Sequence, residues 1–363
     1  MTNSAPSLTD NIKTWLSGYL PVAEHEATAK HYQATIKQWI LLRNYLCVGL
    51  ASASTIVITQ PLDLVKVRLQ LQGELRPPGK HTVMYRTIFQ SLSQIYKLEG
   101  VKRGLYKATS QAWLYQMLSN SVRILVFDKC HTLGLTSDMN EQPVLGRYLM
   151  ASILSGCAGA TIASPFYLAK IQTQAQCHPS MAVGWQHAHP EPRWVLWNCF
   201  RGHKGYLRSG FQGGTSACLR MSVASSTQLF TFTTLQHGLY SLGVHSALLN
   251  SCLSGVLSTV PVVLVSNPFD VICTRMYNQE LEAHYKSIRE CAEKLYRREG
   301  IRGFYKGVVA NYCRTVPHMT LTLVLWHKLR STGIDIQMMD QSYDTLDSDT
   351  EAMHKKLMSK FDS

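Results

Sequence analysis

Charge is the first thing that this sequence lacks. Only 16% of its 363 residues are Asp, Glu, Lys or Arg, well below the roughly 25% that is usual in soluble globular domains. Hydrophobic residues make up 45%, and the mean hydropathy is −0.06. This mixture is typical either of a membrane protein whose helices carry a polar face or of a weakly charged soluble protein.

Catalytic and metal-binding motifs are also lacking. No GxSxG, HExxH or GxxxxGK[ST] sequence occurs, so we expect no enzyme activity and no cofactor. The ten cysteines contain no CxxC pair, which favours reduced thiols over a disulfide framework. One loop gathers cysteines and histidines without the paired spacing of zinc ligands, so we expect no metal. These residues are Cys177, His178, His187, His189, Cys199 and His203.

The first 40 residues lack the apolar core of a signal peptide and mix lysines with acids, so we expect no cleavable presequence. The formal net charge of +13 favours anionic partners, which include small anions, anionic lipid and nucleic acid. Basic and aromatic residues do not interleave as they do in nucleic-acid-binding modules. We therefore expect no nucleic-acid partner.

Three prolines, Pro61, Pro165 and Pro268, lie 104 and 103 residues apart and indicate an internal repeat. Each lies near the end of an uncharged segment long enough to cross a bilayer, because a spanning helix needs about 17–25 residues. The three segments are 44–62, 148–169 and 246–269. A soluble protein with buried helices is the alternative, but three such runs exceed the usual lengths of soluble helices.

A second apolar segment follows a related element in each repeat, so the sequence predicts six membrane-spanning helices. The elements are EGVKRGLYKA at 99–108, KGYLRSGFQG at 204–213 and EGIRGFYKG at 299–307. The loops 66–107, 170–212 and 275–306 hold nine, five and eight Lys or Arg against two, one and five acids. The positive-inside rule then predicts all three loops on one face of the membrane and both termini on the other.

The elements TQPLDLVKVRLQ at 59–70, SPFYLAKIQTQ at 164–174 and SNPFDVICTRMY at 266–277 resemble the triplicated motif of the mitochondrial carrier family. NPFDVICTRMYNQ, SSTQLFTF and YCRTVPH are most similar to the member 34/35 group of solute carrier family 25, which is related to the yeast mitochondrial oxaloacetate carrier. The resemblance implies an all-α membrane protein of six transmembrane helices in three pseudo-threefold repeats. The expected parts are an extension at 1–43, repeats at 44–135, 145–240 and 246–331, and an acidic tail at 337–363.

The resemblance also implies a gate at the ends of the odd-numbered helices. Prolines that remove a helix hydrogen bond would kink these helices and bring their ends together. The implied facing pairs are Asp63 with Lys170, Asp270 with Lys66, and Tyr167 with Cys273, so two pairs are ionic and one is neutral in both members. Gln70 and Gln174 take the positions of the braces that hydrogen-bond to the ionic pairs, and Tyr277 takes the third such position.

Arg220 and Arg314 each lie seven residues after the glycine that starts their segment. In the family, residues at this offset line a central cavity and contact the substrate. Two arginines without an acid beside them require an anion, and their planar forks match two carboxylate or sulfate oxygens. The expected substrate is a dicarboxylate or keto acid such as oxaloacetate, or sulfate or thiosulfate. The expected substrate-binding residues are Tyr115, Gln116, Arg220, Met221, Arg314, Thr315, Arg123 and His318, the last of which is either proton-coupled or simply packed.

The glycines before these segments, Gly213 and Gly307, start helices whose free backbone N–H groups favour phosphate, and in the family such positions resemble cardiolipin sites. The resemblance implies a monomeric antiporter of small anionic metabolites in the mitochondrial inner membrane, with both termini toward the intermembrane space. A carrier-fold scaffold or receptor without transport activity is the alternative. The sequence does not identify the substrate, and it does not distinguish exchange from proton symport.

Overall fold

The computed structural model describes residues 42–74, 83–136, 145–181, 211, 213–279 and 285–331. The chain divides into two units, Met1–Leu46 and Cys47–Ser363. In the first unit the described residues, 42–46, are helical. The second unit contains all of the elements discussed below.

Throughout the described residues the second unit is helical and contains no strand, as the sequence predicts. The long helices are α3 (Ile56–Leu71), α5 (Thr109–Thr132), α6 (Leu145–Ala175), α9 (Gly214–Ser241), α10 (Ala247–Asn278) and α13 (Val308–Ser331). The shorter elements are α4 (Ile88–Glu99), a π-helical turn at Val101–Leu105, a 3₁₀ turn at Pro179–Met181, α11 (Ile288–Glu299) and α12 (Ile301–Phe304).

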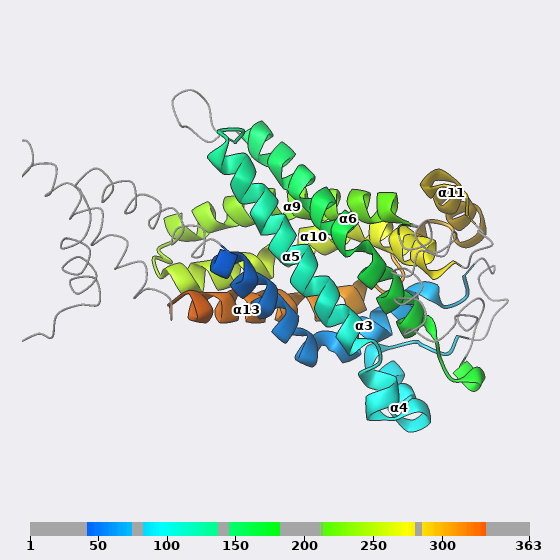
Figure 1. Cartoon of the computed structure of the whole chain (residues 1–363). Coiled ribbons are helices and arrows are strands. Elements are labelled where there is room, and N and C mark those ends of the chain that lie inside the picture. Colours follow the sequence, from blue (N-terminus) through cyan, green and yellow to red (C-terminus); the bar gives the residue numbers. More distant parts are fainter. Residues whose placement is uncertain are drawn as a thin grey trace, which may run out of the picture. The chain divides into compact units, whose positions relative to one another are not determined.

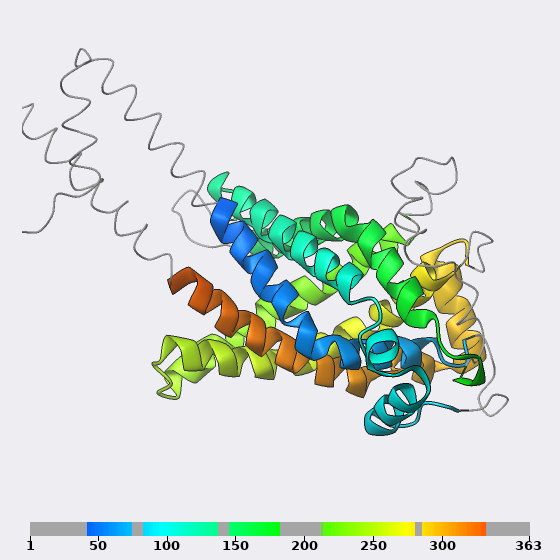
Figure 2. The same ribbon diagram turned by 60° about the horizontal axis from the view of Figure 1, so that its bottom comes forward.

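The long helices form a closed ring in which each packs against two neighbours. The order around the ring is α3, α5, α6, α9, α10, α13 and back to α3. Counted along the chain, the first, third and fifth of these helices are α3, α6 and α10, which we call the odd-numbered spans. They also contact one another inside this ring. Figures 1 and 2 show these helices as one bundle, with the amphipathic helices α4 and α11 at the same end of it. Three similar helix pairs therefore surround one central axis.

The odd-numbered spans are the most apolar part of the bundle. Two stretches, Gly146–Ala175 in α6 and Leu249–Asn278 in α10, are 30 residues long and apolar enough to cross a membrane. A third candidate consists of Leu42–Ser54 and Ile56–Leu71, which meet at a bend of 58°. This bend lies at Thr55, about one and a half turns before Pro61. A proline weakens the helical turn that precedes it, so a bend on this side of Pro61 is the expected one.

The second, fourth and sixth long helices, α5, α9 and α13, are the even-numbered spans. Each of them begins after a residue with left-handed backbone. Gly213 has φ 83° and Gly307 has φ 72°, and both are free of the clash that a Cβ atom causes in this region. The first repeat has Ala108 here, with φ 63°, and it is the single non-glycine residue of positive φ in the described part of the chain. These helices are 24, 28 and 24 residues long, enough for a core of about 30 Å at 1.5 Å per residue.

Candidate functional site

Two buried ion pairs join the odd-numbered spans where α3, α6 and α10 converge. Lys170 Nζ lies 2.7 Å from Asp63 Oδ2, and Lys66 Nζ lies 2.5 Å from Asp270 Oδ2. No side chain of the four is more than 6% exposed. We call the Asp63–Lys170 contact the first ionic junction and the Asp270–Lys66 contact the second ionic junction. Removing one partner of a buried pair strands the other charge, which costs about 3–5 kcal/mol.

Glutamine side chains donate to the same carboxylates. Gln174 Nε2 lies 2.9 Å from Asp63 Oδ2, and Gln70 Nε2 lies 2.9 Å from Asp270 Oδ2. Gln70 is itself held by Thr274, whose hydroxyl donates to Gln70 Oε1 at 2.8 Å. A buried carboxylate needs several donors to replace its lost water, so each ionic junction is a small network rather than a single pair.

The third contact, between α6 and α10, is aromatic. Tyr167 and Cys273 are both buried and belong to one apolar cluster with Tyr115 and Tyr277. The ring of Tyr167 lies 4.8 Å from that of Tyr115 and 4.9 Å from that of Tyr277, measured between centroids. Tyr277 Oη also forms a 2.8 Å hydrogen bond with Ser164 Oγ. We call these four cluster residues the aromatic junction, which joins α6 to α10 by packing and includes Tyr115 from α5.

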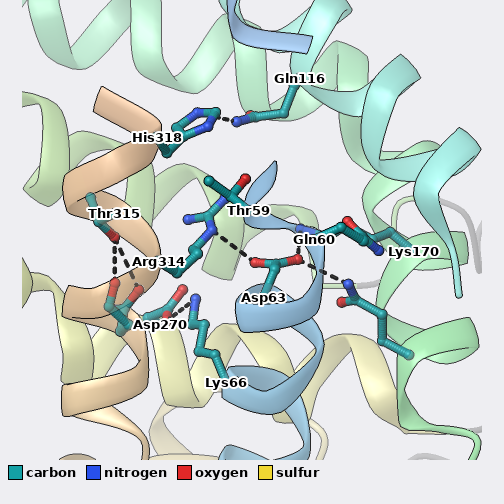
Figure 3. Close-up of polar contacts among 12 residues, drawn as sticks. Thr59, Gln60, Asp63, Lys66, Gln116, Lys170, Asp270, Arg314, Thr315 and His318 are labelled. Atoms are coloured by element: carbon teal, nitrogen blue, oxygen red, sulfur yellow. Dashed lines mark hydrogen bonds and ion pairs between the residues drawn. The ribbon is translucent and has the colours of Figure 1, made fainter. Parts of the chain in front are cut away.

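The two arginines do have acids beside them, so that premise of the sequence argument is wrong. Arg314 Nε lies 2.9 Å from Asp63 Oδ1, and Arg220 Nη1 lies 3.6 Å from Asp270 Oδ1. Figure 3 shows Asp63 between Arg314 and Lys170. The acids come from α3 and α10 while the arginines come from α13 and α9, so sequence spacing within one helix could not reveal the contacts.

Arg220 also contacts the aromatic junction. Its Nη2 donates to Tyr115 Oη at 2.9 Å, and its Cζ lies 5.0 Å above the centre of the Tyr167 ring. This is a cation–π arrangement, which is strongest where water is excluded. The Nε of Arg220 is buried, and within the described residues it has no hydrogen-bond partner. The guanidinium is thus held in place while its buried Nε–H stays without a partner in the described part of the chain.

The cluster has more positive than negative charge. Lys66, Lys170, Arg220 and Arg314 supply four cations against the two carboxylates of Asp63 and Asp270. These six side chains therefore carry a net charge of +2. The two lysines and two carboxylates are at most 6% exposed and the arginines are 14% and 17% exposed, so these charges are poorly screened.

His318 lies one turn beyond Arg314 on α13 and joins three helices. Its Nδ1 is 2.6 Å from Thr55 Oγ1, at the bend before α3, and its Nε2 is 2.7 Å from Gln116 Nε2 on α5. Only 7% of His318 is exposed. Figure 3 shows the His318–Gln116 contact above the Arg314–Asp63 pair.

The remaining expected substrate-binding residues make more local contacts. Thr315 Oγ1 donates to the carbonyl of Asn311 in its own helix at 2.7 Å. Met221 packs against the apolar cluster of the aromatic junction. Arg123 lies in the interface of α5 and α6. Its Cβ is close to Gly159 of α6, since a Cβ added to that glycine would lie 3.4 Å away.

Sequence reasoning missed a second layer of ion pairs at the same end of the bundle. Arg68 and Glu99 pair at 2.7 Å, and Arg275 and Glu299 pair at 2.7 Å. Burial alone would raise the pKa of Glu299, but hydrogen bonds from Arg275 and Lys306 outweigh it and hold the pKa below its ordinary value. Both acids start an EG element, and this repeated position was the available signal.

The expected absence of a metal concerns a loop that is mostly outside the described residues. The described part includes Cys177 and His178 but not His187, His189, Cys199 or His203. Across the described ranges no group of three His, Cys, Asp or Glu side chains could hold a metal ion.

Comparison with known proteins identifies the class to which this fold and site belong. The family model described as "Mitochondrial carrier protein" matches residues 39–137, 141–242 and 244–335, and the chain therefore belongs to the mitochondrial carrier family. This confirms the resemblance and the predicted fold class. Members of this family are transporters rather than enzymes, and the chain is a multi-pass protein of the mitochondrial inner membrane.

Individual relatives include carriers with named substrates. Human solute carrier family 25 member 35 is 35% identical over 297 residues, which cover 79% of this chain and 97% of the relative. The mitochondrial oxaloacetate transport protein of Saccharomyces cerevisiae is 31% identical and covers 77% of this chain and 86% of the relative. Mitochondrial citrate transporter E of Aspergillus niger is 32% identical and covers 77% and 90%.

Proposed function

We propose that the chain transports small dianions, with oxaloacetate and related dicarboxylates as the first candidates and sulfate or thiosulfate as inorganic ones. The observation that carries the proposal is the net charge of +2 on the six side chains around Asp63 and Asp270. A dianion neutralises this charge, whereas a trianion overcompensates it. The oxaloacetate and citrate carriers among the relatives support the wider class of carboxylates.

The arginines would bind the substrate and the ionic junctions would form the gate. Two carboxylates of a substrate would replace Asp63 and Asp270 as partners of Arg314 and Arg220, because Arg forks bind carboxylates strongly. The gate carboxylates would keep their lysines and the braces Gln70 and Gln174. The site would then open alternately to the two sides of the membrane.

The remaining features of the proposal concern the surroundings. We propose that Gly213 and Gly307 start cardiolipin-binding helix ends, since free N–H groups there favour phosphate. The carrier would act as a monomer that either exchanges anions or carries them together with protons, with both termini in the intermembrane space and the basic loops in the matrix. No nucleic acid takes part in this scheme.

The test is reconstitution in liposomes with labelled oxaloacetate, malonate, citrate, sulfate and thiosulfate. We expect uptake of dianions in preference to citrate, and at least a tenfold loss in Arg220→Gln and in Arg314→Gln, since a lost buried charge contact costs about 2–5 kcal/mol. Arg302→Gln is the matched control, because Arg302 is an exposed arginine of α12. If no anion is taken up, the chain is a carrier-fold scaffold or receptor. If the arginine variants transport normally, the site is elsewhere.

A further inference from the structure

The imidazole of His318 has a defined hydrogen-bonding pattern. The side-chain amide of Gln116 donates to Nε2, so the ring proton must be on Nδ1, from which it is donated to Thr55 Oγ1. The hydroxyl proton of Thr55 is used elsewhere, because it is donated to the carbonyl of Ser52 at 2.7 Å. Each donor in this series of hydrogen bonds therefore meets one acceptor, and His318 is neutral.

A rotation of the Gln116 amide alone would let the same hydrogen-bond network hold a protonated His318. An imidazolium donates from both nitrogens and needs two acceptors. Thr55 Oγ1 already accepts, and Gln116 can present its Oε1 if its amide turns by half a rotation. The contact of Gln116 with Ser52 uses the backbone carbonyl and leaves the amide free to turn.

Burial disfavours the protonated form of His318, and the charges that face the ring then add to this effect or oppose it. Arg314 lies one turn away on α13, Lys170 projects from α6, and Asp63 projects from α3, while Gln116 on α5 is neutral. In the empty site these groups belong to the cluster of net charge +2, which opposes another positive charge. A dianion bound by the arginines removes that opposition and adds negative charge within a poorly screened site.

We propose that His318 is a proton-binding site coupled to the anion site. With the arginine site empty, His318 is a neutral bridge between α13, α3 and α5. When a dianion binds, His318 takes one proton from water and Gln116 turns its carbonyl oxygen toward the ring. The proton and the dianion then move together and leave together on the other side. This inference rests on the proposed transport of dianions.

The test measures protons and anions in the same liposomes. The wild-type protein is reconstituted with a pH-sensitive dye inside, the membrane potential is clamped with potassium and valinomycin, and labelled oxaloacetate is added outside. We expect about one proton to enter per dianion. In His318→Gln we expect slower uptake that carries no proton. His237→Gln is the control, since His237 is an exposed histidine of another span, α9, and should retain the wild-type ratio.

The outcomes separate the two proposals. If the wild-type protein moves oxaloacetate without protons, or if His318→Gln keeps the wild-type ratio, the proton site is wrong while dianion transport stands. If the wild-type protein moves no dianion, the proposed function fails and the proton site fails with it.

A second measurement tests the proposal without any variant, in case His318→Gln folds poorly. Calorimetry of oxaloacetate binding to the wild-type protein in detergent, in two buffers of different ionisation enthalpy, gives the protons taken up per anion bound. A value near one supports the proposal, and a value near zero overturns it without any substitution.

Discussion

The ionic junctions join α3 to α6 and to α10, whereas the aromatic junction joins α6 to α10, so the three contacts among these helices use different forces. At each ionic junction a carboxylate is shared by a lysine, an arginine and a glutamine. At the aromatic junction, tyrosine rings in tilted and edge-to-face contact take the place of the charges. Because Tyr167 and Cys273 are both neutral, no charge is stranded there, which would cost several kcal/mol in a buried position.

The difference extends to the second layer of ion pairs. Arg68 with Glu99 and Arg275 with Glu299 belong to the first and third repeats. At the equivalent sequence positions the second repeat has Gln172 and Lys204, so it cannot form an Arg–Glu pair of this kind. The second repeat still supplies Lys170 to the first ionic junction, but its contact with the third repeat relies on packing, and it lacks the Arg–Glu pair of the other two repeats.

The largest effect should come from breaking an ionic junction. Asp63→Ala leaves both Lys170 and Arg314 without their carboxylate, and we expect the free energy of unfolding to fall by about 3–5 kcal/mol. A thermal melt in detergent measures this. Glu293→Ala is the control, because its ion pair with Arg297 is exposed and should contribute little. Equal melting of both variants would mean that the first ionic junction does not stabilise the closed ring.

Introducing charge into the aromatic junction should impair transport. Tyr167→Asp would remove the ring beneath Arg220 and supply a new acid for that arginine, so we expect at least about a tenfold loss of uptake. Adding Cys273→Lys should partly restore uptake, because the lysine can take over the new acid and release Arg220. If the single and double variants transport equally well, Tyr167 and Cys273 do not act as a pair.

Acid should weaken the second layer of ion pairs. The pKa of Glu299 is below its ordinary value, so its contribution to stability is complete above the unfolded pKa and is lost as pH falls through the folded one. We expect the melting temperature to fall mainly below about pH 4.5. In Glu299→Gln this pH dependence should be smaller, while Glu293→Gln should behave as the wild type. An unchanged pH profile in Glu299→Gln would assign the acid sensitivity to other groups.

A smaller effect is expected where the aromatic junction meets Arg220. Tyr115→Phe keeps the ring and removes the hydroxyl that accepts from Arg220 Nη2. A hydrogen bond to a charged group contributes about 1.5–3 kcal/mol, so we expect KM for a dianion to rise by about tenfold. Tyr167→Phe should change KM less, because the cation–π contact of Arg220 is with its ring. Equal effects of the two variants would argue against the role of the Tyr115 hydroxyl.

Much of the fold follows from the sequence because the repeat is strong. Three uncharged runs that contain a proline, each followed by a related element (EGVKRGLYKA, KGYLRSGFQG or EGIRGFYKG), predict helix pairs at a fixed period, and the family comparison confirms the fold. The facing order of the acids and lysines came from the resemblance, and the distances of Asp63–Lys170 and Asp270–Lys66 agree with it.

The position of the arginines could not be predicted in the same way. Whether Arg314 reaches Asp63 depends on how far α13 slides along α3, which no spacing within one helix reports. Similarly, the partners of His318 come from α5 and from the bend at Thr55, a position that lies well before the conspicuous proline. Contacts between repeats required the three-dimensional structure.

The left-handed backbone at Ala108 has a practical consequence for handling the protein. A Cβ in this conformation costs about 1–2 kcal/mol, and the other two repeats avoid that cost with glycine. Ala108→Gly removes it, although glycine loses roughly 0.5–1 kcal/mol more conformational entropy on folding. We expect a net gain of a few degrees in melting temperature, measured in detergent against Ala112→Gly within α5, which should destabilise. Removing one methyl group should therefore raise the stability of this carrier during purification without changing its transport site.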